Sequence, residues 1–151
     1  MAPPYTVRDA TAADIDTLVA FTLQEAREAE SYEANEAAVR RGVEGAFGER
    51  PFAMYWMAEC ERQPVGSVSV VKEWSNFRGG QYWWIQSVFI IPEHRGTGLI
   101  QLLVDHVTSV ARAAGALDLR LYAHGSNERA LHAYRRCGFM PAPYVLMTKR
   151  L

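Results

Sequence analysis

The sequence is poor in the residues that build disulfide frameworks and metal sites. Its two cysteines, Cys60 and Cys137, form no C-x-x-C pair and are too few for a disulfide framework. Its four histidines are scattered rather than spaced as metal ligands. We therefore expect reduced thiols, a reducing compartment and no structural or catalytic metal.

Long apolar runs and an excess of charge of one sign are lacking as well. No stretch reaches the length of a membrane span, and the first residues lack the charged and apolar regions of a secretory signal. The formal net charge is −1, so the overall field favours neither nucleic acid nor an anionic membrane surface. These absences predict a cytoplasmic protein whose partner is neither nucleic acid nor membrane.

The sequence does contain enough apolar material for a core. Of its 151 residues, 49% are hydrophobic, and no linker or shift in composition divides the chain. We therefore expect residues 1–151 to form one domain.

The stretch from Ser87 to Leu103 holds the most informative motif. An apolar strand passes through Pro92 into the loop Arg95-Gly96-Thr97-Gly98, and a helix follows at once. Glycines let backbone amides gather round an anion, and the unpaired amides of the first helical turn add partial positive charge. Gln101 stands where G-x-G-x-x-G needs its third glycine, and no Gly-Lys-Ser/Thr follows, which disfavours Rossmann and P-loop sites. The loop predicts either a cradle for a nucleotide-type ligand or an ordinary strand-to-helix turn.

A later segment favours the cradle. From Asn127 to Phe139 the sequence follows the pattern N-x-x-A-x-x-x-Y-x-x-x-G-F. Together with the loop, this segment resembles the GCN5-related N-acetyltransferase (GNAT) superfamily. The resemblance implies an α/β (α+β) acyl-CoA N-acyltransferase fold, in which helices flank a mixed central sheet, with acetyl-CoA as the cosubstrate.

The loop departs from the superfamily pattern Q/R-x-x-G-x-G/A at one position. Arg95 and Gly98 match it, whereas Ile100 stands where glycine or alanine is usual. A small residue there lets the start of the helix lie close to the pyrophosphate. Because Ile100 shares helical spacing with Val104 and Val107, we expect its side chain to turn into the core.

The order of the predicted elements agrees with this fold. Apolar periodicity, helix caps and turn residues predict the order β-α-α-β-β-β-α-β-α-β. We expect the second and third strands to form an antiparallel hairpin and the fourth to lie in the middle of the sheet. The predicted strands are Tyr5–Asp9, Ala53–Glu61, Val65–Trp74, Gln81–Ile91, Leu117–Ala123 and Met140–Lys149, and the predicted helices begin after Thr11 and cover Glu36–Phe47, Gly98–Ala114 and Asn127–Cys137.

The resemblance also implies which residues bind the coenzyme. The strand before the loop is expected to bond the pantetheine arm through its backbone, because bulging splays that strand from its neighbour. The loop amides are expected to hold the pyrophosphate. Asn127 fits a position that contacts the coenzyme, and asparagine is equally a leading helix N-cap. The residues assigned to acetyl-CoA are Val88, Phe89, Ile90, Arg95, Gly96, Thr97, Gly98, Leu99, Ile100, Asn127 and Tyr134.

The resemblance places Tyr134 at the thioester sulfur, as general acid. A phenol with a pKa of about 10 stays protonated at neutral pH and can reprotonate a departing thiolate with a pKa of about 8.5. The alternative is an aromatic side chain that only packs against its neighbours.

No motif selects the general base that a protonated amine requires. The candidate carboxylates are Glu25, Glu59 and Glu73. Glu73 comes near the end of a predicted strand, beside the Trp74-Ser75 loop that we expect to border the acceptor groove. We therefore take Glu73 as the first choice.

Residues 24–36 are acidic, with five glutamates and one arginine. This segment either attracts a cationic amine or forms a solvated helix face. We assign Glu25, Trp84 and Gln86 to substrate binding, with Trp84 as an aromatic wall for an ammonium group and Gln86 as the group that positions an amine or a water.

The sequence thus predicts an N-acetyltransferase that moves an acetyl group from acetyl-CoA to a primary amine, more specifically that of a small molecule. Three other functions stay open: an acetyltransferase of protein lysines or N-termini, a noncatalytic acyl-CoA-binding module and a nucleotide-binding regulator. An acceptor assay separates the first, and cofactor binding without turnover marks the second. Preference for ATP or NAD over coenzyme A marks the third. A homodimer is open as well.

Overall fold

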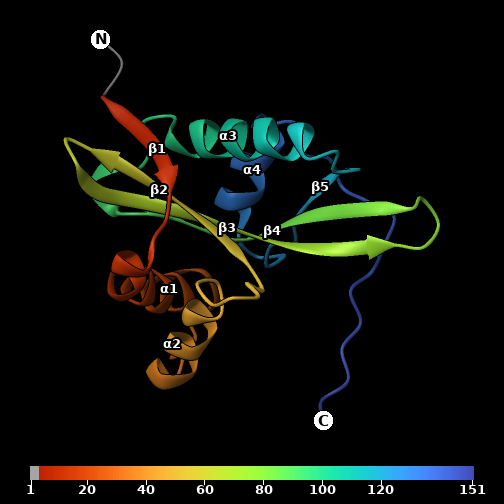
Figure 1. The fold of residues 1–151 in the computed structure, drawn as a ribbon, viewed down its shortest axis with the longest axis horizontal. Helices are drawn as coiled ribbons and strands as arrows, with labels where there is room; N and C mark the ends of the chain where they lie inside the picture. Colours follow the sequence, from red (N-terminus) through yellow and green to blue (C-terminus); the bar gives the residue numbers. More distant parts are fainter. Residues whose placement is uncertain (1–3) are drawn as a thin grey trace.

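The computed structural model describes residues 4–151, which form one mixed sheet with four helices (Figure 1). The strand order is β1-β2-β3-β4-β5, and neighbours are antiparallel except for the parallel pair β4 and β5. This confirms the expected α/β fold class. The strands are β1 (Tyr5–Asp9), β2 (Met54–Cys60), β3 (Gln63–Ser75), β4 (Gly80–Ile90) and β5 (Leu119–Arg120), and the helices are α1 (Ile15–Glu30), α2 (Glu36–Glu44), α3 (Leu99–Ala113) and α4 (Glu128–Arg136).

Helices cover both faces of the sheet, and each face has its own core (Figure 1). Successive side chains of a strand point to opposite faces, so the neighbours Trp56 and Met57 in β2 enter different cores. The first core lies between the sheet and α3 and includes Trp56, Val68, Ile85, Leu103 and Val107. The second lies between the sheet and the α1–α2 pair and includes Leu18, Val43, Met57 and Phe89.

The helix boundaries differ from the predicted ones by more than one residue at two places. Thr11 caps a short 3-10 turn, Ala12–Asp14, and the α-helix itself begins at Ile15. Helix α2 ends at Glu44, before the predicted end at Phe47. Within residues 4–151, no helix combines the length and the apolar character needed to cross a membrane.

The predicted final strand, Met140–Lys149, is wrong. Residues 140–151, which we call the tail, have no regular secondary structure and are exposed throughout. In Figure 1 the tail leaves the body near β5 and ends at the label C. Two physical reasons apply: Pro141 and Pro143 cannot donate backbone hydrogen bonds, and the neighbouring strand predicted for Leu117–Ala123 is only Leu119–Arg120.

Strand β4 separates from β5 beyond a bulge, and this opens the sheet. Ser69 of β3 lies opposite Ser87, whereas Val70 lies opposite Ile85, so Gln86 is an extra residue in β4. The pairing of β4 with β5 covers only Trp83 and Trp84, while β4 continues to Ile90. The second half of β4 therefore keeps one edge that β5 does not cover.

Candidate functional site

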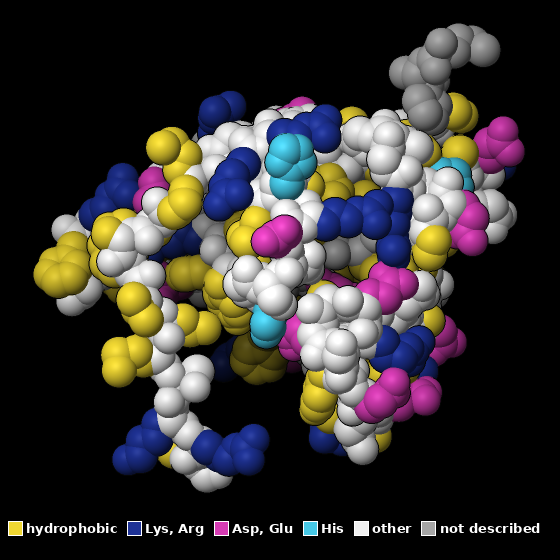
Figure 2. Space-filling view, turned by 180° about the vertical axis from the view of Figure 1, so that it is seen from behind, with side chains coloured by type: hydrophobic (Ala, Val, Ile, Leu, Met, Phe, Trp, Pro, Cys, Tyr) yellow, Lys and Arg dark blue, Asp and Glu magenta, His cyan; other side chains and the backbone are white. Residues whose placement is uncertain are grey.

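A cavity of about 630 Å³ lies where β4 and β5 part. Its lining comes from α1, the second half of β4, the loop before α3, residues 121–124 after β5, and α4. Figure 2 shows this face of the molecule, where basic and acidic side chains border a hollow with hydrophobic side chains at its floor. The volume is within the range of small-molecule and cofactor sites.

The loop before α3 has the geometry of an anion cradle. Gly96 and Gly98 have φ angles of 73° and 85°, values that favour glycine. Gly98 is the N-cap of α3, so the unpaired amides of the first helical turn begin at the cavity. Thr97 does not line the cavity; its hydroxyl donates to the carbonyl oxygen of His94 at 2.7 Å.

The branched residue at the start of α3, Ile100, both lines the cavity and packs into the core. Ile100 is half-buried and packs against the core between the sheet and α3, which confirms the expected orientation. Leu99 beside it is 1% exposed, so its side chain belongs to that core, although the residue still lines the cavity.

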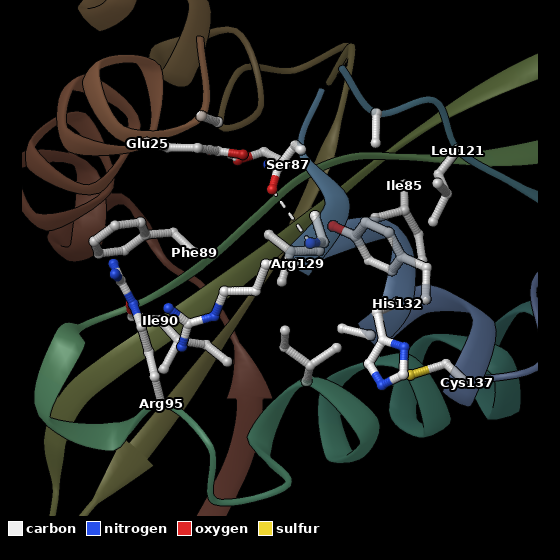
Figure 3. Close-up of a pocket in the computed structure, with 18 of the residues that line it drawn as sticks. Glu25, Ile85, Ser87, Phe89, Ile90, Arg95, Leu121, Arg129, His132 and Cys137 are labelled. Atoms are coloured by element: carbon white, nitrogen blue, oxygen red, sulfur yellow. Dashed lines mark hydrogen bonds between the residues drawn. The ribbon is translucent and has the colours of Figure 1, made fainter. Parts of the chain in front are cut away.

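Arg95 lies at the edge of the cavity and already has several partners. Its Nε donates to the carbonyl oxygen of Ile90 at 2.9 Å, and its guanidinium forms an ion pair with Glu28 of α1. The guanidinium also lies 5.7 Å from the centre of the Phe89 ring. Arg95 thus joins α1, β4 and the cradle (Figure 3).

Helix α4 brings basic side chains to the cavity that the sequence analysis did not identify. Arg129, His132 and Arg136 line it, together with His124 from the preceding loop. In Figure 3, Arg129 extends into the middle of the cavity, between Arg95 and His132. The spacing 129, 132 and 136 is a helical i, i+3, i+7 stripe, and this pattern could have indicated a basic face.

Tyr134 and Asn127, both assigned from the family motif, also line the cavity. Burial raises the pKa of Tyr134 to about 12, and the nearby Glu25 carboxylate adds to the rise. The phenol is therefore protonated at neutral pH. Asn127 is the N-cap of α4, where its side chain accepts from the amide of Ala130 at 3.2 Å.

Glu25 of α1 reaches across to β4, where the hydroxyl of Ser87 donates to its carboxylate (Figure 3). Burial raises the pKa of Glu25 to about 7, although the hydrogen bonds from Ser87 and the Val88 amide act in the opposite direction. A carboxyl group with this pKa exchanges protons at neutral pH.

A second, smaller cavity of about 320 Å³ adjoins the first. It lies between α1, α2 and the sheet, and the lining shared by both cavities includes Glu25, Glu30, Gln86 and Ser87. Tyr55 and the fully buried Ser69 line only the smaller one. Glu25 therefore stands at the junction of two adjoining cavities.

The structure does not bring the other assigned residues to this junction. Glu73 is exposed and accepts a hydrogen bond from the indole of Trp84 at 3.2 Å; neither residue lines either cavity. Glu59 is paired with Arg8 at 2.7 Å and lines neither cavity. Of the proposed substrate-binding residues, Glu25 and Gln86 line both cavities, and Trp84 lines neither.

Comparison with known proteins gives a family match. The model of the acetyltransferase (GNAT) family matches residues 16–139. Among curated proteins, streptothricin acetyltransferase of Streptomyces lavendulae is 42% identical over 55 residues, which are 36% of this chain and 29% of that protein. The chain spans 60% or less of the length of the curated relatives that it matches.

Solved structures share the fold over nearly the whole chain. A possible acetyltransferase of Clostridium difficile 630 has a TM-score of 0.90 at 24% identity, and the match covers 97% of both chains. A predicted acetyltransferase of Clostridium acetobutylicum, solved with acetyl-CoA, has a TM-score of 0.79 at 18% identity and a match covering 96% of both chains.

Proposed function

The chain belongs to the acetyltransferase (GNAT) family, and from this premise we propose that it transfers the acetyl group of acetyl-CoA to a primary amine of a small molecule. The observation that carries the proposal is that a half-buried phenol, Tyr134, and a half-buried carboxyl group, Glu25, line one cavity that begins at an anion cradle. The carboxyl group can accept a proton from the attacking amine, and the phenol can donate one to the departing sulfur.

The binding of acetyl-CoA is supported by three features of the larger cavity. The amides from Gly96 to Ile100 suit the pyrophosphate, since glycine φ angles and a helix N-terminus favour an anion. The uncovered edge of β4 at residues 88–90 offers backbone groups to the pantetheine arm. Arg129 supplies a positive charge for the phosphates. Asn127 lines the same cavity beside its role as a cap.

Acetyl-CoA supplies an activated thioester, in which the C–S bond breaks as the amine forms the new C–N bond. In the proposed mechanism Tyr134 holds its proton at neutral pH and donates it to the sulfur as negative charge develops there. With a pKa above the roughly 8.5 of a free thiol, this phenol acts mainly as a hydrogen-bond donor to the developing thiolate, and the proton that it passes to the sulfur is regained from the acceptor amine.

We assign the role of base to Glu25 and no longer to Glu73, because Glu25 lies at the junction and Glu73 does not. An ammonium group loses two protons on becoming an amide; one ends on the sulfur and the other in solvent. A carboxylate with a pKa of about 7 accepts a proton from an ammonium group of pKa about 10 more readily than an ordinary glutamate, by roughly 3 kcal/mol. Ser87 holds the carboxylate toward the cavity.

The smaller cavity supports a small cationic acceptor. At about 320 Å³ it is near the lower end of ligand-site volumes. Two carboxyl groups, Glu25 and Glu30, and the polar side chains of Gln86 and Tyr55 line it. Such a lining suits an ammonium group on a compact molecule better than an extended peptide.

The test is acceptor-dependent release of coenzyme A from acetyl-CoA. The panel holds polyamines, amino acids, aminoglycosides and a lysine peptide, and Tyr134→Phe and Glu73→Gln run beside the unchanged protein. We expect release with small amines, a loss of about 100-fold or more in Tyr134→Phe and no loss in Glu73→Gln. Release only with the peptide contradicts the small-molecule acceptor. Binding of acetyl-CoA by calorimetry without release from any acceptor contradicts the enzyme.

A further inference from the structure

One buried hydroxyl in the middle of the sheet has no partner. Ser69 of β3 is 0% exposed, and its Oγ makes no hydrogen bond with any residue that the structure describes. Buried hydroxyls in native proteins nearly always have a partner, because an unpaired one has lost its hydrogen bonds to water. Ser69 lines the smaller cavity, so a molecule bound there can supply the partner.

A second unpaired buried atom has a different setting. Among residues 4–151, the Nε2 of His106 also has no hydrogen-bond partner. His106 lies on α3, and its ring is 5.9 Å from that of Trp56 in the core between the sheet and α3. It lines neither cavity. The unpaired atom of Ser69 is therefore the one that belongs to a ligand-sized space.

Ser69 is the middle member of a row of three hydroxyl groups. It lies opposite Tyr55 of β2 and opposite Ser87 of β4. Residues directly opposite one another on paired strands point to the same face of a sheet, here the face that α1 and α2 cover. All three side chains line the smaller cavity. At its Ser87 end the row meets the carboxylate of Glu25, which accepts the Ser87 hydroxyl hydrogen.

The Tyr55 hydroxyl lies near that of Ser69 without bonding to it. Burial raises the pKa of the Tyr55 phenol, and the nearby hydroxyl of Ser69 acts in the opposite direction. The Tyr55 ring stacks on Phe47, with 6.2 Å between the ring centres, and this fixes the direction of the phenol. Every hydroxyl both donates and accepts, so a bound hydroxyl can donate to one of the two side chains and accept from the other.

Charge in the smaller cavity is confined to one end. Glu30 is exposed and Glu25 is half-buried, whereas Ser69 is completely buried and uncharged. The lining formed by the described residues includes no lysine, arginine or histidine. A bound carboxylate would therefore meet two carboxyl groups and no cation, which is costly. An ammonium group is best matched at Glu25, and an uncharged hydroxyl is best matched at Ser69.

The sheet also sets the spacing between these two groups. Ser69 and Ser87 lie on adjacent strands, which are about 4.8 Å apart. The Glu25 carboxylate is held at Ser87. A molecule with its amine against Glu25 and its hydroxyl against Ser69 therefore carries the two groups roughly 5 Å apart. Such a spacing corresponds to a short carbon chain between them.

We propose that the acceptor is a short amino alcohol, whose amine faces Glu25 and whose hydroxyl is bound by Ser69 and Tyr55. Ser69 is then a residue that determines specificity. This inference rests on the proposed function, because the bound amine is the group that receives the acetyl group. Tyr55 and Ser69 line only the smaller cavity, so the hydroxyl is kept away from the thioester. The product is therefore the amide, and the hydroxyl leaves unchanged.

The test compares acceptors of similar size by their kcat/KM for release of coenzyme A. Propanolamine, with its amine and hydroxyl at opposite ends, is measured beside butylamine, which has a methyl group in place of the hydroxyl, and beside β-alanine, which ends in a carboxylate. We expect the unchanged protein to prefer propanolamine to butylamine by about tenfold or more. β-Alanine should be the poorest of the three.

Ser69→Ala should abolish the preference by lowering kcat/KM for propanolamine about tenfold while leaving that for butylamine unchanged. Ser67→Ala is the matched control, since Ser67 is a buried serine on the same strand and face but lines neither cavity. It should keep the preference. Tyr55→Phe is a second variant that should lose it, and it keeps the test open if Ser69→Ala does not fold.

Calorimetry in the presence of coenzyme A gives a readout that does not require turnover. Ser69→Ala should raise the Kd for propanolamine about tenfold and leave the Kd for coenzyme A unchanged. Equal kcat/KM for propanolamine and butylamine in the unchanged protein overturns the inference and leaves the proposed function standing. A preference that survives both Ser69→Ala and Tyr55→Phe overturns it as well. Without release from any amine the proposed function fails; selective binding of propanolamine then still supports the inference, and its absence overturns it.

Discussion

Replacing Glu25 by glutamine should change how the stability of the protein depends on pH. Burial raises the pKa of Glu25 from an ordinary 4.5 to about 7, so the folded protein keeps this proton to a higher pH than the unfolded chain does. Between these two values the folded state binds more protons, and the free energy of unfolding falls as pH rises. The total loss is roughly 3 kcal/mol, complete above pH 7. Glutamine cannot ionise, and Glu25→Gln therefore avoids the loss.

The assay is denaturant unfolding of both proteins at pH 5 and at pH 8. Other groups titrate in both proteins, so their contributions cancel in the difference between variant and unchanged protein. We expect the free energy of unfolding of Glu25→Gln, relative to that of the unchanged protein, to increase by up to roughly 3 kcal/mol from pH 5 to pH 8. Glu73→Gln, at an exposed position, should show no such change. A Glu25→Gln difference that is the same at both pH values refutes the reasoning.

The same variant tests the proposed base through kinetics. In the unchanged protein kcat/KM should rise with pH up to about 7, as Glu25 loses its proton. Glu25→Gln should no longer show this rise of kcat/KM up to about pH 7, and its rate should be lower by about 100-fold or more. The only remaining rise of kcat/KM with pH should be the one that comes from deprotonation of the acceptor's own ammonium group. If the stability difference appears while the rate profile is unchanged, Glu25 is a buried acid without a catalytic role.

Three further substitutions test the cavity. Tyr134→Phe should lower kcat by about 100-fold or more while the Kd for acetyl-CoA, measured by calorimetry, changes less than about threefold. Gly98→Ala should lower the free energy of unfolding by about 1–2 kcal/mol, because its φ of 85° strains any other residue, and raise the Kd for coenzyme A. Arg129→Gln should raise that Kd about tenfold in low salt, whereas Arg78→Gln, outside the cavity, should not.

The parts of the fold that sequence could predict are those with local signals. The apolar periodicity of α3 and the turn glycines at 96 and 98 marked the cradle, and the motif from Asn127 to Phe139 marked the helix that carries Tyr134. The sheet order and the bulge at Gln86 depend on pairing between distant segments, which a single strand's pattern does not encode. Glu25 and Ser87 are 62 positions apart, so no spacing rule could join them.

The prediction of a final strand was wrong for a related reason. The continuous apolar content of residues 144–147, with an aromatic and a β-branched residue, is typical of a strand. Whether such a segment becomes a strand depends on an edge within reach, and the two prolines before it restrict where it can go. A pattern can thus indicate that a segment suits a strand without predicting whether an edge lies within reach.

The acidic segment of α1 shows how surroundings decide the role of one residue type. Burial raises the pKa of Glu25 to about 7, while hydrogen bonds from Gln24 and Arg95 lower the pKa of Glu28, one helical turn later. Glu33, beyond the end of the helix, is exposed and lines neither cavity. The ion pair between Glu28 and Arg95 fastens α1 to the cradle loop, and Glu25 is thereby held at the junction of the two cavities. Charge density in the sequence therefore located the region, and burial against β4 distinguished Glu25 from the other carboxyl groups.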